Sequence, residues 1–208
     1  ICMHETSKDN TCNILPPQKV RKMHTSKRDA FKPINAEKLG SVNYQTDEIN
    51  TNFTEDSGEY EKSTELDTDV GVLKIRPGMR PEELDFLNEL DNSGVVIEGT
   101  GLGHMPVNAF DKKTEHHAEI LEKVEELAED TVVVLASQCL NGRIDMNVYD
   151  AGIKIQDAGV IKSEDMHPEL AYVKLMWALG QTDSMDEAKE LFQENVNGEI
   201  SDRSLYEG

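Results

Sequence analysis

The chain has 208 residues, and its 41 acidic and 21 basic side chains give a formal net charge of −20. At about 150 residues per domain, this length corresponds to one or two domains. The negative charge argues against binding of nucleic acid through a broad basic surface. No apolar run approaches the ~18 residues that span a bilayer, and the polar opening segment does not resemble a signal peptide. Three cysteines without CxxC spacing argue against a disulfide framework or a zinc site and favour a reducing, cytoplasmic location.

The charge is unevenly distributed along the chain. Residues 1–38 contain eight Lys or Arg and four Asp or Glu, a net of +4, so the rest of the chain carries −24 (−20 minus +4). Residues 45–58 are polar, acidic and poor in large apolar side chains, which indicates a linker or an exposed hairpin. We therefore predict the tail of one domain at residues 1–40, an inter-domain linker at 41–66 and a second domain at 67–208. Because the first residue is Ile rather than Met, we expect the chain to be a fragment of a longer protein.

The second domain alternates short apolar runs with helical stretches. In chain order, the pattern predicts a strand at 70–75, a helix at 81–90, a strand at 94–98, a helix at 114–129 with Thr114 as its N-cap, strands at 131–136 and 159–161, and helices at 167–179 and 185–196. Strands this apolar are buried on both faces, as in a parallel sheet between layers of helices. The sequence therefore predicts an α/β fold, with a Rossmann-like C-terminal domain whose parallel sheet is flanked by helices.

Two polar segments follow the second and third strands of this domain, at the edge of a parallel sheet where ligands bind. Residues 98–106 contain three alternating glycines, which would let a ligand approach backbone N–H groups; a tight turn without a ligand fits equally well. The glycines lack GxGxxG spacing, which disfavours a dinucleotide. Residues 137–150 are longer than the usual connection of about 4–6 residues, which favours contact with a small molecule or a subunit over a capped irregular loop.

A basic segment at residues 20–31 carries Lys22 among Arg21, Lys27 and Arg28. Neighbouring cations favour a neutral amine and hence a role in proton transfer. Recognition of an anion is another interpretation, and by composition alone an ordinary basic loop is favoured over both.

Two other groups of reactive residues are interpreted as structural. His116 and His117 are adjacent on a predicted helix and point in different directions, which indicates a solvated helix face rather than a metal site. Cys139 has no identifiable partner histidine, so we expect a buried, inert thiol rather than a nucleophile.

Four motifs occur in the order found in the asparaginases that use a threonine nucleophile. They are Arg-Lys-Met-His-Thr-Ser at 21–26 followed by Asp-Ala-Phe at 29–31, Glu-Gly-Thr-Gly-Leu-Gly-His at 98–104, Ser-Gln-Cys-Leu-Asn-Gly-Arg at 137–143, and Ala-Gly-Val-Ile at 158–161 with Asp-Met at 165–166. The chain resembles this family over nearly its whole length, most weakly at residues 41–66. Within the family, the first two motifs are more similar to the D subunits of archaeal glutamyl-tRNA(Gln) amidotransferases than to free asparaginases.

This resemblance implies amide hydrolysis by a threonine nucleophile, with Lys22 as the catalytic lysine that shuttles protons. It also implies that residues 1–40 are the tail of an N-terminal α/β asparaginase catalytic domain. The Thr-Gly-Gly-Thr and Gly-Thr-Asp-Thr motifs that carry the nucleophile and a threonine–aspartate pair do not occur in the sequence. We therefore expect the chain alone to be inactive.

The same resemblance implies a glutaminase subunit that releases ammonia from glutamine for the conversion of Glu-tRNA(Gln) to Gln-tRNA(Gln). The implied partner is the E subunit of the amidotransferase, which binds the tRNA and uses ATP and Mg, and the implied assembly is a homodimer of D subunits within a heterotetramer. No cofactor, metal or membrane contact is expected for this chain. A free L-asparaginase is the alternative enzyme, and an α/β binding or assembly module without chemistry is the alternative class.

The resemblance further suggests residues that contact substrate or a neighbouring subunit, because in asparaginases this domain completes the active site of a neighbour. The candidates in the glycine-rich segment are Thr100, Gly101, Leu102 and His104, although bacterial asparaginases carry asparagines where this chain has Leu102 and His104. The candidates in the second segment are Asn147, Tyr149 and Asp150.

Overall fold

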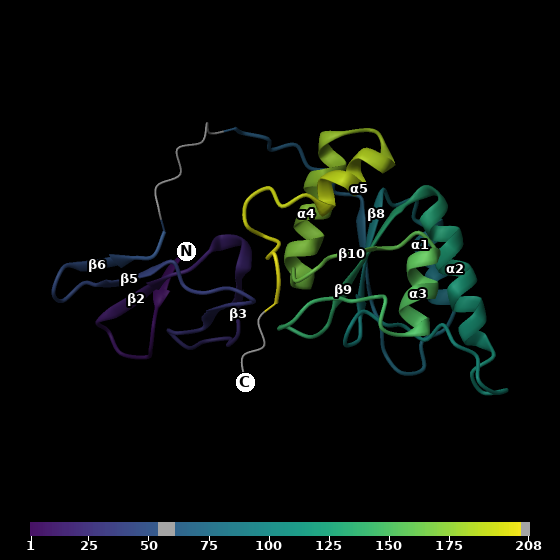
Figure 1. Ribbon diagram of the computed structural model, residues 1–208, viewed down its shortest axis with the longest axis horizontal. Coiled ribbons are helices and arrows are strands. Elements are labelled where there is room, and N and C mark those ends of the chain that lie inside the picture. Colours follow the sequence, from purple (N-terminus) through teal and green to yellow (C-terminus); the bar gives the residue numbers. More distant parts are fainter. Residues whose placement is uncertain (54–60, 205–208) are drawn as a thin grey trace.

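The computed structural model describes residues 1–53 and 61–204, and it contains a β-rich N-terminal part and an α/β C-terminal part (Figure 1). The N-terminal part has an antiparallel sheet with the strand order β1 (Cys2–His4), β2 (Thr11–Ile14), β5 (Gly40–Asn43) and β6 (Glu48–Thr51). A short 3-10 turn, η1 (Pro17–Lys19), leads into a separate hairpin of β3 (Val20–Lys22) and β4 (Phe31–Pro33). The antiparallel sheet thus extends into the segment that the sequence analysis assigns to the linker at 41–66; residues 54–60 lie outside the described part.

The C-terminal part contains a parallel sheet in which each strand lies beside the strand that precedes it in the chain. The sheet order is β10 (Ile161–Lys162), β9 (Val132–Ser137), β8 (Gly94–Gly99) and β7 (Val70–Lys74). Successive right-handed crossovers that move in one direction across a sheet place their helices on the same face. The helices α1 (Glu82–Glu89), α2 (His116–Asp130) and α3 (Asp150–Asp157) accordingly cover one face, and α4 (Pro168–Gln181) and α5 (Met185–Gln193) cover the other (Figure 1).

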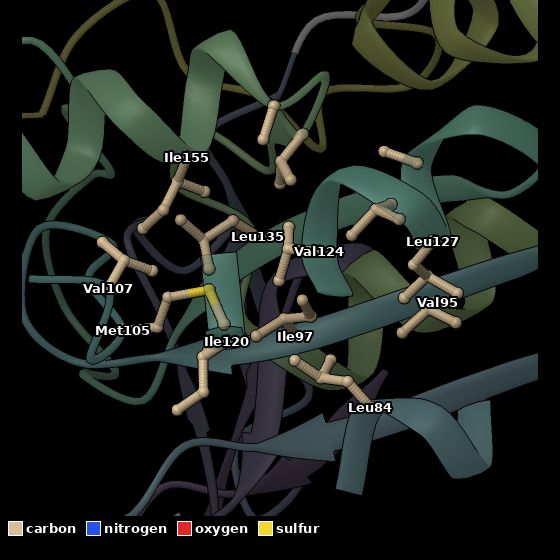
Figure 2. Packing of buried hydrophobic residues seen from close by; sticks show 14 of the residues in the cluster. Leu84, Val95, Ile97, Met105, Val107, Ile120, Val124, Leu127, Leu135 and Ile155 are labelled. Carbon is tan, nitrogen blue, oxygen red and sulfur yellow. The ribbon is translucent and has the colours of Figure 1, made fainter. Parts of the chain in front are cut away.

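Both faces of the central strands are buried, because alternate side chains of a strand point to opposite faces. In β8, Val95 and Ile97 pack towards α1, α2 and α3, whereas Val96 packs towards α4 and α5. Figure 2 shows the first of these clusters, where Leu84 of α1 and Val124 of α2 lie against the strand residues. The prediction of an α/β fold with a parallel sheet between helices is therefore confirmed.

Several local predictions differ from the structure. The last strand begins at Ile161 rather than 159, because Gly159 has a left-handed φ of 89° and follows the end of α3. Helix α3 lies where the sequence analysis predicted no element, and α5 ends at Gln193 rather than 196. Thr114 does not cap α2: its hydroxyl accepts the N–H groups of Phe110 and Asp111 and so closes the preceding turn.

None of the helices within the described ranges is long and apolar enough to cross a membrane.

Candidate functional site

The glycine-rich segment after β8 folds into a tight turn. The N–H of Thr100 donates to the carbonyl oxygen of His104 over 2.9 Å, and the N–H of His104 donates back to Thr100 over 2.9 Å. Gly101 and Gly103 have left-handed φ angles of 55° and 99°, which glycine adopts without strain. A Cβ at Gly103 would also lie 2.9 Å from Cγ2 of Ile144. The backbone geometry and packing of the turn therefore explain these two glycines without a ligand, as the tight-turn interpretation requires.

The segment after β9 holds this turn in place. The hydroxyl of Ser137 donates to the carbonyl oxygen of Gly101 over 2.6 Å. The N–H of Asp145 donates to the carbonyl oxygen of Leu102 over 3.1 Å. The rings of His104 and Tyr149 meet edge to face, with centroids 5.3 Å apart. The structure therefore brings the two predicted segments together at the carboxyl edge of β8 and β9.

Most of the predicted residues at this edge are open to solvent. Thr100, Gly101, Asn147, Tyr149 and Asp150 are exposed. Leu102 and His104 are half-buried. The Asn147 amide and N–H group bind the carboxylate of Asp145, and Asp150 pairs with Lys154 over 2.9 Å in α3. An exposed polar edge of this kind can contact a ligand or a second subunit; whether it does so stays a prediction.

Lys22 lies elsewhere, at the end of β3, where it pairs with Phe31 of β4. Its side chain is exposed, and within the described residues its amine forms no hydrogen bond or ion pair. Among the described residues, no hydrogen bond or ion pair joins the Lys22 side chain to the turn at 100–104 or to residues 147–150. The catalytic role of Lys22 therefore stays a prediction from the resemblance.

A buried polar contact that the sequence analysis missed connects the hairpin to the C-terminal part. The Lys19 ammonium lies 2.7 Å from the Asp165 carboxylate, and the two side chains are 5% and 0% exposed. The amide of Asn35 donates to the carbonyl oxygens of Gly142 and Asp165 over 3.1 and 2.8 Å. Lys19 and Asp165 are 146 residues apart in sequence, so no local pattern could indicate their pairing.

The structure also places the cysteine and the paired histidines that the sequence analysis considered. Cys139 is exposed, so the prediction of a buried thiol is wrong: it lies in the loop after β9 rather than in the core. His117 binds the carbonyl oxygen of Asn108 over 2.9 Å. Among the residues that the structure describes, no group of three or more His, Cys, Asp or Glu side chains could hold a metal ion.

An open cavity of about 390 Å³ lies near the starts of α1 and α2, where Arg80, Lys113 and His116 are part of its lining. None of the predicted site residues lines it. It therefore gives no support to the residues chosen from the sequence.

Comparison with known proteins identifies related sequences over almost all of the chain. The family model "Glutaminase/Asparaginase C-terminal domain" matches residues 69–192. The D subunit of a glutamyl-tRNA(Gln) amidotransferase from Methanosarcina mazei is 43% identical, over 99% of this chain and 47% of its own length. The D subunit from Methanobrevibacter smithii is 39% identical, over 98% of this chain and 45% of its own length. The chain thus spans about half the length of the curated relatives it matches.

Solved structures show the same architecture. The thermostable L-asparaginase from Thermococcus kodakarensis superposes with a TM-score of 0.80 at 32% identity, covering 91% of this chain and 55% of that one. L-asparaginase I from Vibrio cholerae superposes with a TM-score of 0.71 at 26% identity, covering 93% and 56%. These comparisons confirm the resemblance found in the sequence motifs.

Proposed function

The chain belongs to the glutaminase/asparaginase family through its C-terminal domain, and on this premise we propose that it is part of the glutaminase subunit of a tRNA-dependent amidotransferase. The observation that carries the proposal is the 43% identity to the D subunit from Methanosarcina mazei over 99% of the chain. This identity extends through both the hairpin and the C-terminal domain. The proposal concerns the whole protein, because the curated relatives are about twice as long as this chain.

The proposed reaction is the hydrolysis of the glutamine side-chain amide. A threonine hydroxyl from outside these 208 residues adds to the amide carbon, and the C–N bond breaks as ammonia leaves. Water then cleaves the acyl-enzyme, which releases glutamate and restores the threonine. Lys22 shuttles protons during both steps. The exposure of its amine, which is unengaged within the described residues, supports this role because the amine is open to contact from another part of the protein.

One edge of the C-terminal part contacts glutamine or a neighbouring copy of the same subunit. It is formed by Thr100, Gly101, Leu102 and His104 in the glycine-rich turn and by Asn147, Tyr149 and Asp150 in the second segment. The contact between His104 and Tyr149 supports a common role for the two segments.

The ammonia passes to the partner, the E subunit of the amidotransferase, which activates the glutamate of Glu-tRNA(Gln) with ATP and Mg in the cytoplasm. Two copies of the D subunit form a homodimer within a heterotetramer, and this chain contributes no cofactor. The charge distribution supports tRNA binding by the partner: the residues after position 38 carry −24 (−20 minus +4), which repels a phosphate backbone.

The test measures ammonia release from glutamine and from asparagine by the full-length protein, with and without the partner subunit and Glu-tRNA(Gln). We expect glutamine to be the preferred substrate and Lys22→Ala to reduce its hydrolysis by about 10²–10⁴-fold. The unfolding midpoint should not change, because the Lys22 side chain is exposed. Lys8→Ala, which removes another exposed cation of the N-terminal part outside the basic segment at 20–31, is the control and should retain activity. Undiminished ammonia release from Lys22→Ala would show that Lys22 is not catalytic and would favour a binding or assembly role, without chemistry, for this part of the protein.

A free L-asparaginase is the second candidate, because a solved L-asparaginase shares the fold with a TM-score of 0.80. Hydrolysis of asparagine in preference to glutamine, without any partner subunit, would favour this candidate.

A further inference from the structure

The strand that carries Lys22 is attached to the C-terminal domain at two points. The Lys19 ammonium, immediately before β3, lies 2.7 Å from the Asp165 carboxylate. The Arg21 guanidinium lies 2.6 Å from the carboxylate of Glu169. Asp165 lies in the connection between β10 and α4, and Glu169 lies in the first turn of α4. The connection before α4 and the first turn of α4 thus contact the chain on both sides of Val20.

The Asp165 contact is the more enclosed of the two. The Asp165 side chain is 0% exposed, whereas those of Arg21 and Glu169 are 37% and 54% exposed. The second oxygen of Asp165 accepts the N–H of Ser201 over 3.0 Å. Burial alone would raise the pKa of Asp165, but hydrogen bonds from Lys19 and Ser201 hold that pKa below its ordinary value. The carboxylate is therefore ionised at neutral pH and fully paired.

The second strand of the hairpin is fixed to the same place. Asn35, just beyond β4, donates its amide N–H to the carbonyl oxygen of Asp165 over 2.8 Å. Ser201, whose hydroxyl accepts from the Lys19 ammonium, belongs to the C-terminal segment, which passes between the two parts of the molecule (Figure 1). The Asp165 position is thus the point at which hairpin, C-terminal domain and C-terminal segment meet.

Lys22 depends on this attachment more than a packed side chain would. A two-stranded hairpin is marginally stable on its own. The Lys22 side chain is exposed and, within the described part of the chain, forms no polar contact that could fix its amine. The position of the amine is therefore set by the backbone of β3, and a proton relay loses much of its rate when such a group is displaced by about 1 Å.

We propose that Asp165 is a positioning residue for amide hydrolysis, because its contact with Lys19 fixes β3 and thereby the location of the Lys22 amine. This inference rests on the proposed function of Lys22 and adds a residue that does not itself touch substrate. The C-terminal domain then contributes to the reaction by holding a catalytic element that belongs to the other part of the chain.

The test uses the full-length protein with its partner subunit and measures kcat and KM for glutamine per folded molecule. Asp165→Asn should lower kcat by about tenfold or more and leave KM within about twofold, since the substrate contacts remain while the relay is displaced. Lys19→Met should have the same effect, and Lys19→Arg, which preserves the charged contact, should restore kcat. If Asp165→Asn does not fold, the comparison of Lys19→Met with Lys19→Arg still decides the test.

The matched control is Lys174→Met, which disrupts another buried ion pair. Lys174 and Glu199 are 5% and 6% exposed and pair over 2.5 Å, but neither has an ion pair with β3 among the described residues. This variant should lose stability and retain kcat per folded molecule. Equal kcat values for Lys19→Met, Lys19→Arg and Lys174→Met, in a protein that Lys22→Ala inactivates, would overturn the positioning role alone. Full activity of Lys22→Ala would instead overturn the catalytic role of Lys22, and the inference with it, whereas a wild type that releases no ammonia from glutamine would overturn the proposed function.

Discussion

The imidazole of His104 packs edge-on against the ring of Tyr149, with the centroids 5.3 Å apart and the planes inclined by 65°. His104 closes the turn after β8, and Tyr149 immediately precedes α3. Two segments that are 45 residues apart in sequence (149 minus 104) therefore present one continuous edge at the carboxyl ends of β8 and β9.

Substitution of Tyr149 tests whether this edge contacts substrate or a neighbouring subunit. Tyr149 is 59% exposed, so Tyr149→Ala should lower the free energy of unfolding by less than about 1 kcal/mol. We expect a several-fold rise in KM for glutamine or weaker self-association of the full-length protein, measured by kinetics and sedimentation. Phe110→Ala, at an aromatic residue that is 83% exposed, is the control. If both properties of Tyr149→Ala match those of the wild type, the edge has neither role.

The packing face of α1 can be tested with two neighbouring residues. Leu84 is 0% exposed in the cluster between α1, α2 and the sheet, whereas Phe86 is 60% exposed on the same helix. Leu84→Ala should lower the free energy of unfolding by about 2–5 kcal/mol, because it leaves a cavity in a closely packed core. Phe86→Ala should change it by less than about 0.5 kcal/mol. Urea unfolding measures both values, and a similar loss in the two variants would contradict the assigned face.

Gly152 allows α3 to approach the preceding loop closely. A Cβ at this position would lie 2.5 Å from the carbonyl oxygen of Met146 and 2.9 Å from its Cα. Both atoms belong to the backbone, so Gly152→Ala should destabilise the fold by about 1–3 kcal/mol. Gln156→Ala, at an exposed position of the same helix, is the reference. An unfolding midpoint as high as that of the reference would show that α3 can move away without cost.

The buried carboxylate of Glu199 predicts a loss of stability in acid. Burial alone would raise the pKa of Glu199, but hydrogen bonds from Lys174 and from the N–H groups of Val196 and Asn197 hold it below its ordinary value. The unfolded chain therefore binds this proton more tightly than the folded protein. Its contribution to stability is complete above about pH 5 and is lost as the pH falls through the lowered pKa.

Glu199→Gln should remove this part of the acid dependence, so that its stability changes less than that of the wild type between about pH 3 and 5. It should also cost about 3 kcal/mol at pH 7, because it leaves Lys174 buried without a carboxylate. Burial lowers the pKa of Lys174, and the hydrogen bond and charge of Glu199 oppose this shift. Urea unfolding across the pH range gives both quantities, with Glu125→Gln at an exposed position of α2 as the control. Parallel pH profiles for wild type and Glu199→Gln would contradict the assignment.

The meeting of the glycine turn with residues 147–150 could be predicted because both segments follow neighbouring parallel strands, which end at the same edge of the sheet. The exposure of Cys139 could not, since it depends on how the loop after β9 lies on the surface. Helix α3, Asp150–Asp157, was also missed. Two helical turns are too short for hydrophobic periodicity to distinguish them from a loop.

The sequence by itself determined the alternation of strands and helices, the sheet buried on both faces and the family motifs, because each of these depends on residues close together in the chain. Only the tertiary structure decided that Lys19 is buried and that Asp165, 146 residues away, is its partner. Lysine is almost never fully buried unless it is paired, and the partner is supplied by the folded chain rather than by neighbouring residues. The attachment of the hairpin to the C-terminal domain is therefore a property of the fold, whereas the presence of Lys22 on that hairpin is a property of the sequence.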